Sequence, residues 1–97
     1  MDKINQLCLH ATVHGRVQGV SFRYFVLDCA RRLDLSGWVR NRYNGTVEVK
    51  AEGEQEKLDT LIRDLKRGSS ASRVTQVDHQ WSDATGEFTT FKIRMTR

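Results

Sequence analysis

A loop bounded by two glycines carries the residues whose types and spacing favour chemistry. It reads Gly15-Arg16-Val17-Gln18-Gly19-Val20. Glycine permits backbone angles that turn successive N–H groups to one side, and such a turn makes a concave anion site. A helix that begins just after the loop would add free N–H donors and a partial positive charge. The pattern therefore indicates a phosphate-binding loop.

Arg23 lies in the first turn of that expected helix. Its planar guanidinium group can bind two phosphate oxygens at once. The segment ends in no G-K-[ST] sequence, which excludes a P-loop, and it lacks the G-x-G-x-x-G pattern of dinucleotide sites. On spacing alone, a tight strand-to-helix turn with a solvated arginine explains the segment as well as a phosphate site does.

Asn41 is the second candidate, at the end of the sequence Gly37-Trp38-Val39-Arg40-Asn41. Asparagine is favoured near turns, and that structural role is the commoner one. An amide beside a bound phosphate would have another use, because it both donates and accepts hydrogen bonds without carrying charge. It can therefore orient a water molecule for in-line attack.

Hydrophobic patterns predict the elements that position these residues. Apolar residues alternate, as in strands, over residues 7–14, 36–41, 46–52, 74–82 and 91–95, and they recur at helical spacing over 22–33 and 54–66. Asn44-Gly45 is a hairpin signal. We expect Ser21 to cap the first helix, Asp34 to end it in a left-handed conformation, and Gly68 to stop the second helix.

The element order β-α-β-β-α-β-β predicts an α+β fold, a ferredoxin-like α/β sandwich. In this fold two helices cover one face of a mostly antiparallel sheet, to which a short fifth strand is added. The length of 97 residues predicts a single domain over residues 1–97. The first six residues lack the layout of a secretory signal, and no apolar run approaches the ~20 residues of a membrane span, so a cytoplasmic location is expected.

Composition favours anionic partners and argues against a metal site. The net charge of +4 favours anionic partners without choosing among them. The three histidines lack zinc-finger spacing, and no acidic cluster of the magnesium-binding kind is present, so no metal is expected. Cys8 and Cys29 are expected as reduced thiols, with Cys29 buried on the apolar side of its helix and the exposure of Cys8 left open. Trp38 and Trp81 are expected to pack rather than to stack on a ligand.

Taken together, these segments resemble the acylphosphatase family over nearly the whole chain. The matching residues are Gly15, Val17-Gln18-Gly19-Val20, Phe22-Arg23, Ala30, Leu33, Leu35, Gly37-Trp38-Val39, Asn41, Gly45, Val47 and Glu52-Gly53. The resemblance implies hydrolysis of the carboxyl–phosphate bond of acyl phosphates by water, with no cofactor, metal or covalent phosphoenzyme. It implies that Arg23 and Asn41 are catalytic and that residues 15–20 bind the phosphate.

The chain departs from the family pattern at four places. Asp34 stands where glycine is frequent, Arg42 where some members have threonine, the loop 68–72 lacks a proline, and the last residue is Arg97 rather than an aromatic. None of these changes removes a catalytic group. Arg42 follows Asn41 directly, so a change in substrate preference or rate is the expected consequence.

Two other classes of function fit the fold. An RNA-recognition motif needs aromatic residues on its central strands, and residues 46–52 contain none and include two acids. An anion sensor needs the arginine but not the water-orienting amide. His14 as a general base and Ser21 as a nucleophile are weaker alternatives. The expected partners are thus acyl phosphates and inorganic phosphate, with no nucleic acid and no membrane, bound by a monomer.

Overall fold

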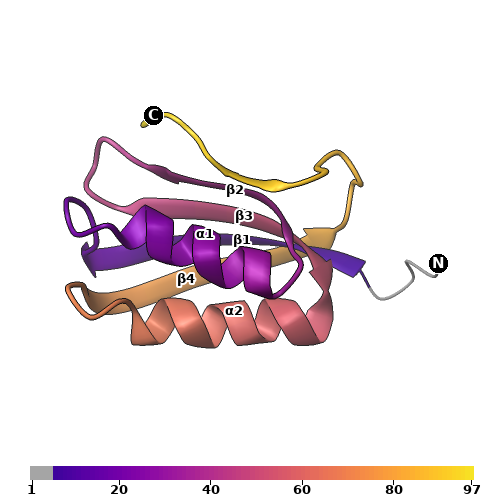
Figure 1. The fold of residues 1–97 in the computed structure, drawn as a ribbon, viewed down its shortest axis with the longest axis horizontal. Coiled ribbons are helices and arrows are strands. Elements are labelled where there is room, and N and C mark those ends of the chain that lie inside the picture. Colours follow the sequence, from indigo (N-terminus) through magenta and orange to yellow (C-terminus); the bar gives the residue numbers. More distant parts are fainter. Residues whose placement is uncertain (1–5) are drawn as a thin grey trace.

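The computed structural model describes residues 6–97 (Figure 1). The expectation that the first six residues form no secretory signal therefore lies almost entirely outside the described residues. The chain forms seven elements in the predicted order. These are β1 (Gln6–Arg16), α1 (Phe22–Arg32), β2 (Ser36–Asn41), β3 (Val47–Glu54), α2 (Gln55–Arg67), β4 (Arg73–Asp83) and β5 (Phe91–Ile93). Each lies within a few residues of its predicted bounds.

The strands form one sheet in the order β4-β1-β3-β2-β5. The four strands β4, β1, β3 and β2 pair antiparallel, and β5 adds to β2 in parallel. Both helices lie on the same face of the sheet, in front of it in Figure 1. The predicted ferredoxin-like sandwich with a fifth strand is confirmed.

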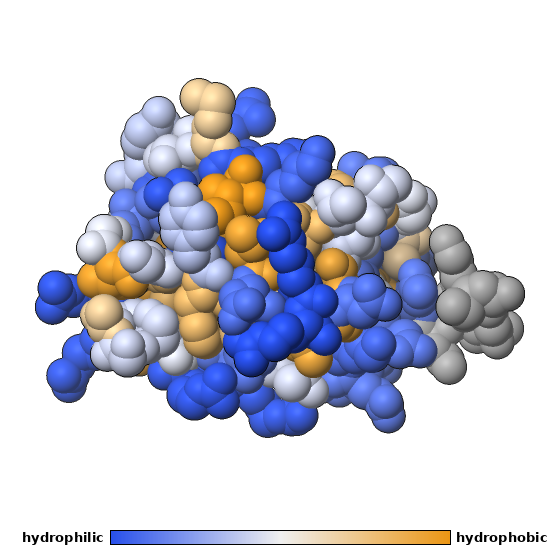
Figure 2. Space-filling view, in the orientation of Figure 1, coloured by the Kyte–Doolittle hydropathy of each residue, from blue (hydrophilic) through white to orange (hydrophobic). Residues whose placement is uncertain are grey.

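The core lies between the sheet and the helices. The apolar alternation of β1 turns Leu9, Ala11 and Val13 toward the helices, where each is almost fully buried. Buried residues from α1 and α2 complete this layer: Phe22, Val26, Cys29, Ala30, Leu58, Leu61, Ile62 and Leu65. In the same orientation, Figure 2 shows mostly hydrophilic residues along the lower side of the molecule, over α2. The amphipathic pattern of α2 therefore reflects one buried and one solvated face.

Three helix ends test the predicted caps. Ser21 stands at the N-cap of α1, but its backbone is left-handed (φ 60°, ψ 25°) and its side chain makes no capping hydrogen bond. Its predicted role as a cap is therefore wrong, because a capping side chain needs an extended backbone at that position. Asp34 is left-handed (φ 59°) and Gly68 ends α2 with φ 73°, as predicted.

The structure also shows whether the two cysteines and the two tryptophans are buried. Cys29 and Trp38 are buried, as expected. Trp81, on the edge strand β4, packs edge-on against the ring of His79 but stays exposed and does not enter the core. Cys8 is buried although it faces away from the helices, and its neighbours there include Ser82 and Glu52. No helix among residues 6–97 is long and apolar enough to cross a membrane.

Candidate active site

The first two residues of the predicted phosphate loop, Gly15 and Arg16, still belong to β1 and pair with β4. The register of β1 against β4 shifts between His14 and Gly15, which is the mark of a β-bulge. Gly15 has a φ of 121°, and a Cβ atom at this position would overlap the carbonyl oxygen of Arg73. Only glycine fits this close approach, so Gly15 allows β1 to stay paired with β4 through the bulge.

The loop that follows is anchored by its apolar residues and leaves its backbone accessible. Val17 is buried in the core, and Val20 packs partly against it. Arg16 and Gly19 are exposed. Gly19 is left-handed with φ 72°, and so is Ser21 two residues later. Left-handed residues of this kind occur in the nests whose N–H groups point into one concavity and bind anions.

Arg23 lies at the start of α1, directly after this loop, and its side chain is half-buried. The first turn of α1 contains no acidic residue. The ion pairs found among residues 6–97 do not include Arg23. Its positive charge therefore adds to that of the helix N-terminus without a carboxylate partner in the described chain.

Asn41 lies at the same end of the sheet, on a different strand. It pairs with Val47, which in turn pairs with Val13 shortly before the loop. Two strand spacings place Asn41 about 10 Å from β1. The loop after β1 and the β2–β3 hairpin lie together at the left end of the molecule in Figure 1. The sequence predicted the loop and Asn41 as parts of one site, and the sheet register brings them to the same end of the sheet.

The side-chain oxygen of Asn41 is buried without a hydrogen-bond partner in the described chain. A buried acceptor left unpaired costs on the order of 1–3 kcal/mol, and such groups are rare in folded proteins. An unpaired amide oxygen beside the predicted phosphate loop is suited to accept a hydrogen bond from a water molecule or a ligand.

The side chain of Gln18 joins the loop to the hairpin. Its Nε2 donates to the carbonyl oxygens of Arg42 at 2.7 Å and Thr46 at 2.8 Å. Both hydrogens of the amide group are thereby used, so the donor that Gln18 retains for a phosphate is its backbone N–H. This contact between loop and hairpin was not foreseen from the sequence, because nothing local in either segment signals it.

The face of the sheet without helices carries a charged cluster next to Asn41. Glu48 accepts hydrogen bonds from His10, from Arg40 at 2.8 Å and from Arg42 at 3.1 Å. Burial opposes ionisation of Glu48, but these hydrogen bonds outweigh it and lower its pKa to about 2. Arg42, the departure beside the candidate asparagine, is thus bound through its side chain to a strand residue.

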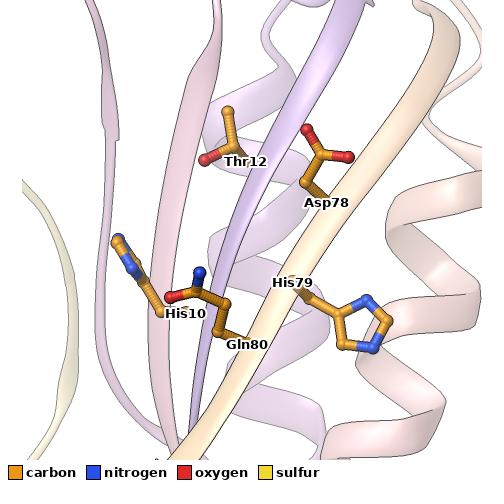
Figure 3. A pocket seen from close by; sticks show the side chains of 5 residues that line it. All are labelled: His10, Thr12, Asp78, His79 and Gln80. Atoms are coloured by element: carbon orange, nitrogen blue, oxygen red, sulfur yellow. The ribbon is translucent and has the colours of Figure 1, made fainter.

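A hollow of about 200 Å³ lies on the same helix-free face, across β1 and β4 (Figure 3). The residues that line it are His10, Thr12, Asp78, His79 and Gln80, and the carboxylate of Asp78 would repel a phosphate. His14 binds Asp78 at 3.0 Å there, which favours a structural role for this histidine over that of a general base. The hollow is therefore a poorer phosphate site than the loop after β1.

A family model, curated relatives and solved structures all indicate the acylphosphatase family. Residues 9–93 match the family model described as Acylphosphatase. An acylphosphatase of Salinibacter ruber is 48% identical over 84 residues, which cover 87% of this chain and 88% of that protein. The crystal structure of acylphosphatase from Bacillus subtilis is 41% identical with a TM-score of 0.88, covering 91% of this chain and 98% of that one. The structure of an acylphosphatase from Coxiella burnetii is 35% identical with a TM-score of 0.90, covering 97% and 98%.

Proposed function

The chain belongs to the acylphosphatase family, and from this premise we propose that it hydrolyses acyl phosphates by in-line attack of water, without a metal ion or a covalent phosphoenzyme. In the proposed reaction the water oxygen bonds to phosphorus and the bond between phosphorus and the acyl oxygen breaks. The carboxylate leaves with the electron pair, and the proton of the water passes to a phosphate oxygen. The products are a carboxylate and inorganic phosphate.

The chemistry of the substrate fits a site with few reactive groups. An acyl phosphate is a mixed anhydride, and its carboxylate is already a good leaving group. Phosphoryl transfer of this kind depends on positioning and on stabilising the charge of the equatorial oxygens. Backbone N–H groups of residues 15–20 and the guanidinium group of Arg23 are donors suited to that task, whereas a strong general acid is not needed.

Asn41 is proposed to orient the attacking water through its side-chain oxygen. The observation that carries this proposal is that this oxygen is buried and has no hydrogen-bond partner among residues 6–97, at the end of the sheet where the loop lies. A carbonyl-type oxygen can accept one hydrogen of a water molecule and leave its lone pair free for phosphorus. The amide stays neutral, so it adds no repulsion against the phosphate.

Benzoyl phosphate provides the test, since its hydrolysis lowers its ultraviolet absorbance. Turnover should persist in the presence of a chelator and should be nearly abolished in Arg23→Ala. Arg63→Ala, a change of the same kind on the exposed face of α2, should retain the wild-type rate. Turnover that stops with the chelator would contradict the metal-free reaction. A folded wild type that binds phosphate without turnover would instead point to an anion-binding module.

A further inference from the structure

We propose that Gln18 is a positioning residue that sets the distance between the phosphate loop and Asn41. The inference rests on the proposed function, because it concerns how the bound phosphoryl group meets the water held by Asn41. Gln18 acts in it through its side-chain amide and touches neither the reacting phosphorus nor the water.

The two carbonyl groups bound by Gln18 flank the Asn41 pair. Arg42 follows Asn41 in the chain, and Thr46 precedes Val47, the residue opposite Asn41 in the sheet. Gln18 Nε2 donates to both carbonyl oxygens, at 2.7 and 2.8 Å. If Gln18 moved along this end of the sheet, the loop would move relative to Asn41, and at least one of the two hydrogen bonds would lengthen.

The hairpin that receives Gln18 is held by its own hydrogen bonds. Arg42 N–H donates to Thr46 O at 2.8 Å, and Gly45 N–H donates to Arg42 O at 3.1 Å. The Asn44 side-chain oxygen accepts from the backbone N–H of Thr46 at 3.1 Å and from its hydroxyl group at 2.7 Å. The hairpin should thus keep its shape when Gln18 is replaced.

The loop has a separate anchor. Val17, next to Gln18, is 1% exposed and belongs to the hydrophobic core. Each half of the site is therefore secured independently, and Gln18 is the side chain that joins them. Its loss should loosen the geometry between the halves while each half stays folded and the loop still binds phosphate.

A less fixed distance between the loop and Asn41 should slow the attack of water on phosphorus. In-line attack needs the water oxygen close to phosphorus and opposite the leaving group, and a misplacement of about 1 Å can cost on the order of 100-fold in rate. In the proposed site the loop and Arg23 bind the phosphate, and Asn41 binds the water instead. The proposed role therefore predicts a lower kcat with little change in phosphate affinity.

Two substitutions remove the donors while nearly preserving the size of the side chain. Gln18→Met has no donor and no charge, and Gln18→Glu places a carboxylate opposite the two carbonyl oxygens. Gln80→Met, on the exposed surface of β4, is the matched control. For each variant we would measure kcat, the inhibition constant of inorganic phosphate, and the melting temperature.

We expect Gln18→Met to lower kcat by about 10- to 100-fold, with phosphate inhibition within about threefold of wild type. Gln18→Glu should lower kcat at least as much, and Gln80→Met should leave all three quantities unchanged. A lower melting temperature with unchanged kcat, measured well below the transition, would reduce Gln18 to a structural residue and overturn the proposal. A loss of phosphate affinity equal to the loss of rate would overturn it as well, since it would mean direct contact with the substrate.

A double-mutant cycle with Asn41→Ala gives the sharper readout. If Gln18 acts by placing Asn41, then adding Gln18→Met to Asn41→Ala should cost little further rate. Losses that multiply would contradict the proposed coupling. A folded wild type without turnover would remove the proposed function and this inference with it, whereas an active wild type with unchanged Gln18 variants would remove this inference alone.

Discussion

Glu52 binds Thr85 twice, although the two residues are 33 positions apart: one carboxylate oxygen accepts from both the backbone N–H and the hydroxyl group of Thr85, each at 2.9 Å. The other oxygen accepts from Gly86 N–H at 3.0 Å. These bonds hold the connection that leads from β4, at one edge of the sheet, to β5 at the other edge. Because β5 pairs with β2, the strand that ends in Asn41, Glu52 supports the candidate site from the far end of the sheet.

Glu52→Gln should lower the free energy of unfolding by about 2 kcal/mol, because hydrogen bonds to a buried charged acceptor are the strong ones and an amide group would face N–H donors. Urea denaturation of both proteins measures this difference. Asp83→Asn, which neutralises an exposed carboxylate at the end of β4, is the control and should change stability by less than about 0.5 kcal/mol. Equal losses in the two variants would contradict the role given to Glu52.

Acid should destabilise the protein through Glu48. Its pKa is lowered from the ordinary 4.5 to about 2 when the chain folds, because the hydrogen bonds from His10, Arg40 and Arg42 outweigh its burial. The unfolded chain then binds more protons in acid, so this contribution is complete above pH 4.5 and is lost as the pH falls toward 2. The loss should reach roughly 3 kcal/mol.

Urea midpoints between pH 6 and pH 2 measure that loss. Glu48→Gln should be less stable than wild type at pH 6 and should show a flatter dependence on pH, since the group that titrates is gone. The pKa of Glu52 is also lowered, so part of the acid loss should persist in this variant. A variant whose midpoint falls as steeply as that of wild type would show that Glu48 does not titrate as described.

Alternating apolar residues were sufficient to predict the strands, because one face of each inner strand packs on the helices. The alternation in β1 is clear for this reason. The helical spacing of apolar residues in α2 is equally clear, because that stripe of the helix is buried against the sheet. The edge strand β4 is the weaker case. It buries little of its surface, and Trp81, which was expected to pack, is exposed there.

Long-range contacts were beyond the reach of local patterns. Nothing near Gln18 in the sequence indicates that its amide binds carbonyl groups 24 and 28 residues later. The same is true of Cys8, whose partners across the sheet, Glu52 and Ser82, lie far from it in the sequence. Ser21 shows a further limit, because serine before a helix signals a cap, whereas here the left-handed backbone of the loop prevents one.

Two glycines of the loop should respond differently to alanine. Gly15→Ala places a Cβ atom on the carbonyl oxygen of Arg73 and also strains the backbone at φ 121°. At Gly19 the added atom meets open space among the described residues, so only the backbone at φ 72° is strained. We expect Gly19→Ala to cost about 1 kcal/mol and Gly15→Ala clearly more. Urea denaturation gives both values, and the opposite order would contradict the close approach at Gly15.

Asp34 offers a stabilising change. It ends α1 with φ 59°, a conformation that costs a residue with a Cβ atom about 1–2 kcal/mol and glycine almost nothing. The greater freedom of glycine in the unfolded chain offsets part of this gain. Asp34→Gly should therefore raise stability by about 0.5–1 kcal/mol, seen as a higher melting temperature. Asp34→Ala is the paired control and should lower it, so a loss in both variants would contradict the argument.

Asn41 provides the decisive prediction for the mechanism, because the proposed water-orienting role and a turn-forming role lead to different kinetics. Asn41→Ala removes the unpaired buried oxygen without adding charge. If that oxygen holds the attacking water, kcat should fall by about 100- to 1,000-fold, the usual cost of losing one well-placed polar group in a transition state. The inhibition constant of inorganic phosphate should stay near that of wild type, since the loop and Arg23 remain intact.

Asn41→Asp separates the two roles further. The variant keeps an oxygen acceptor of the same size, but a carboxylate near the loop repels the phosphate. Its phosphate inhibition should therefore weaken, and the effect should shrink as the pH falls and the carboxyl group is protonated. Asn44→Ala, in the turn of the same hairpin, controls for the loss of an asparagine there and should lower stability more than kcat. If Asn41→Ala keeps nearly the full rate, then Asn41 does not hold the water, and its unpaired oxygen has a cause other than catalysis.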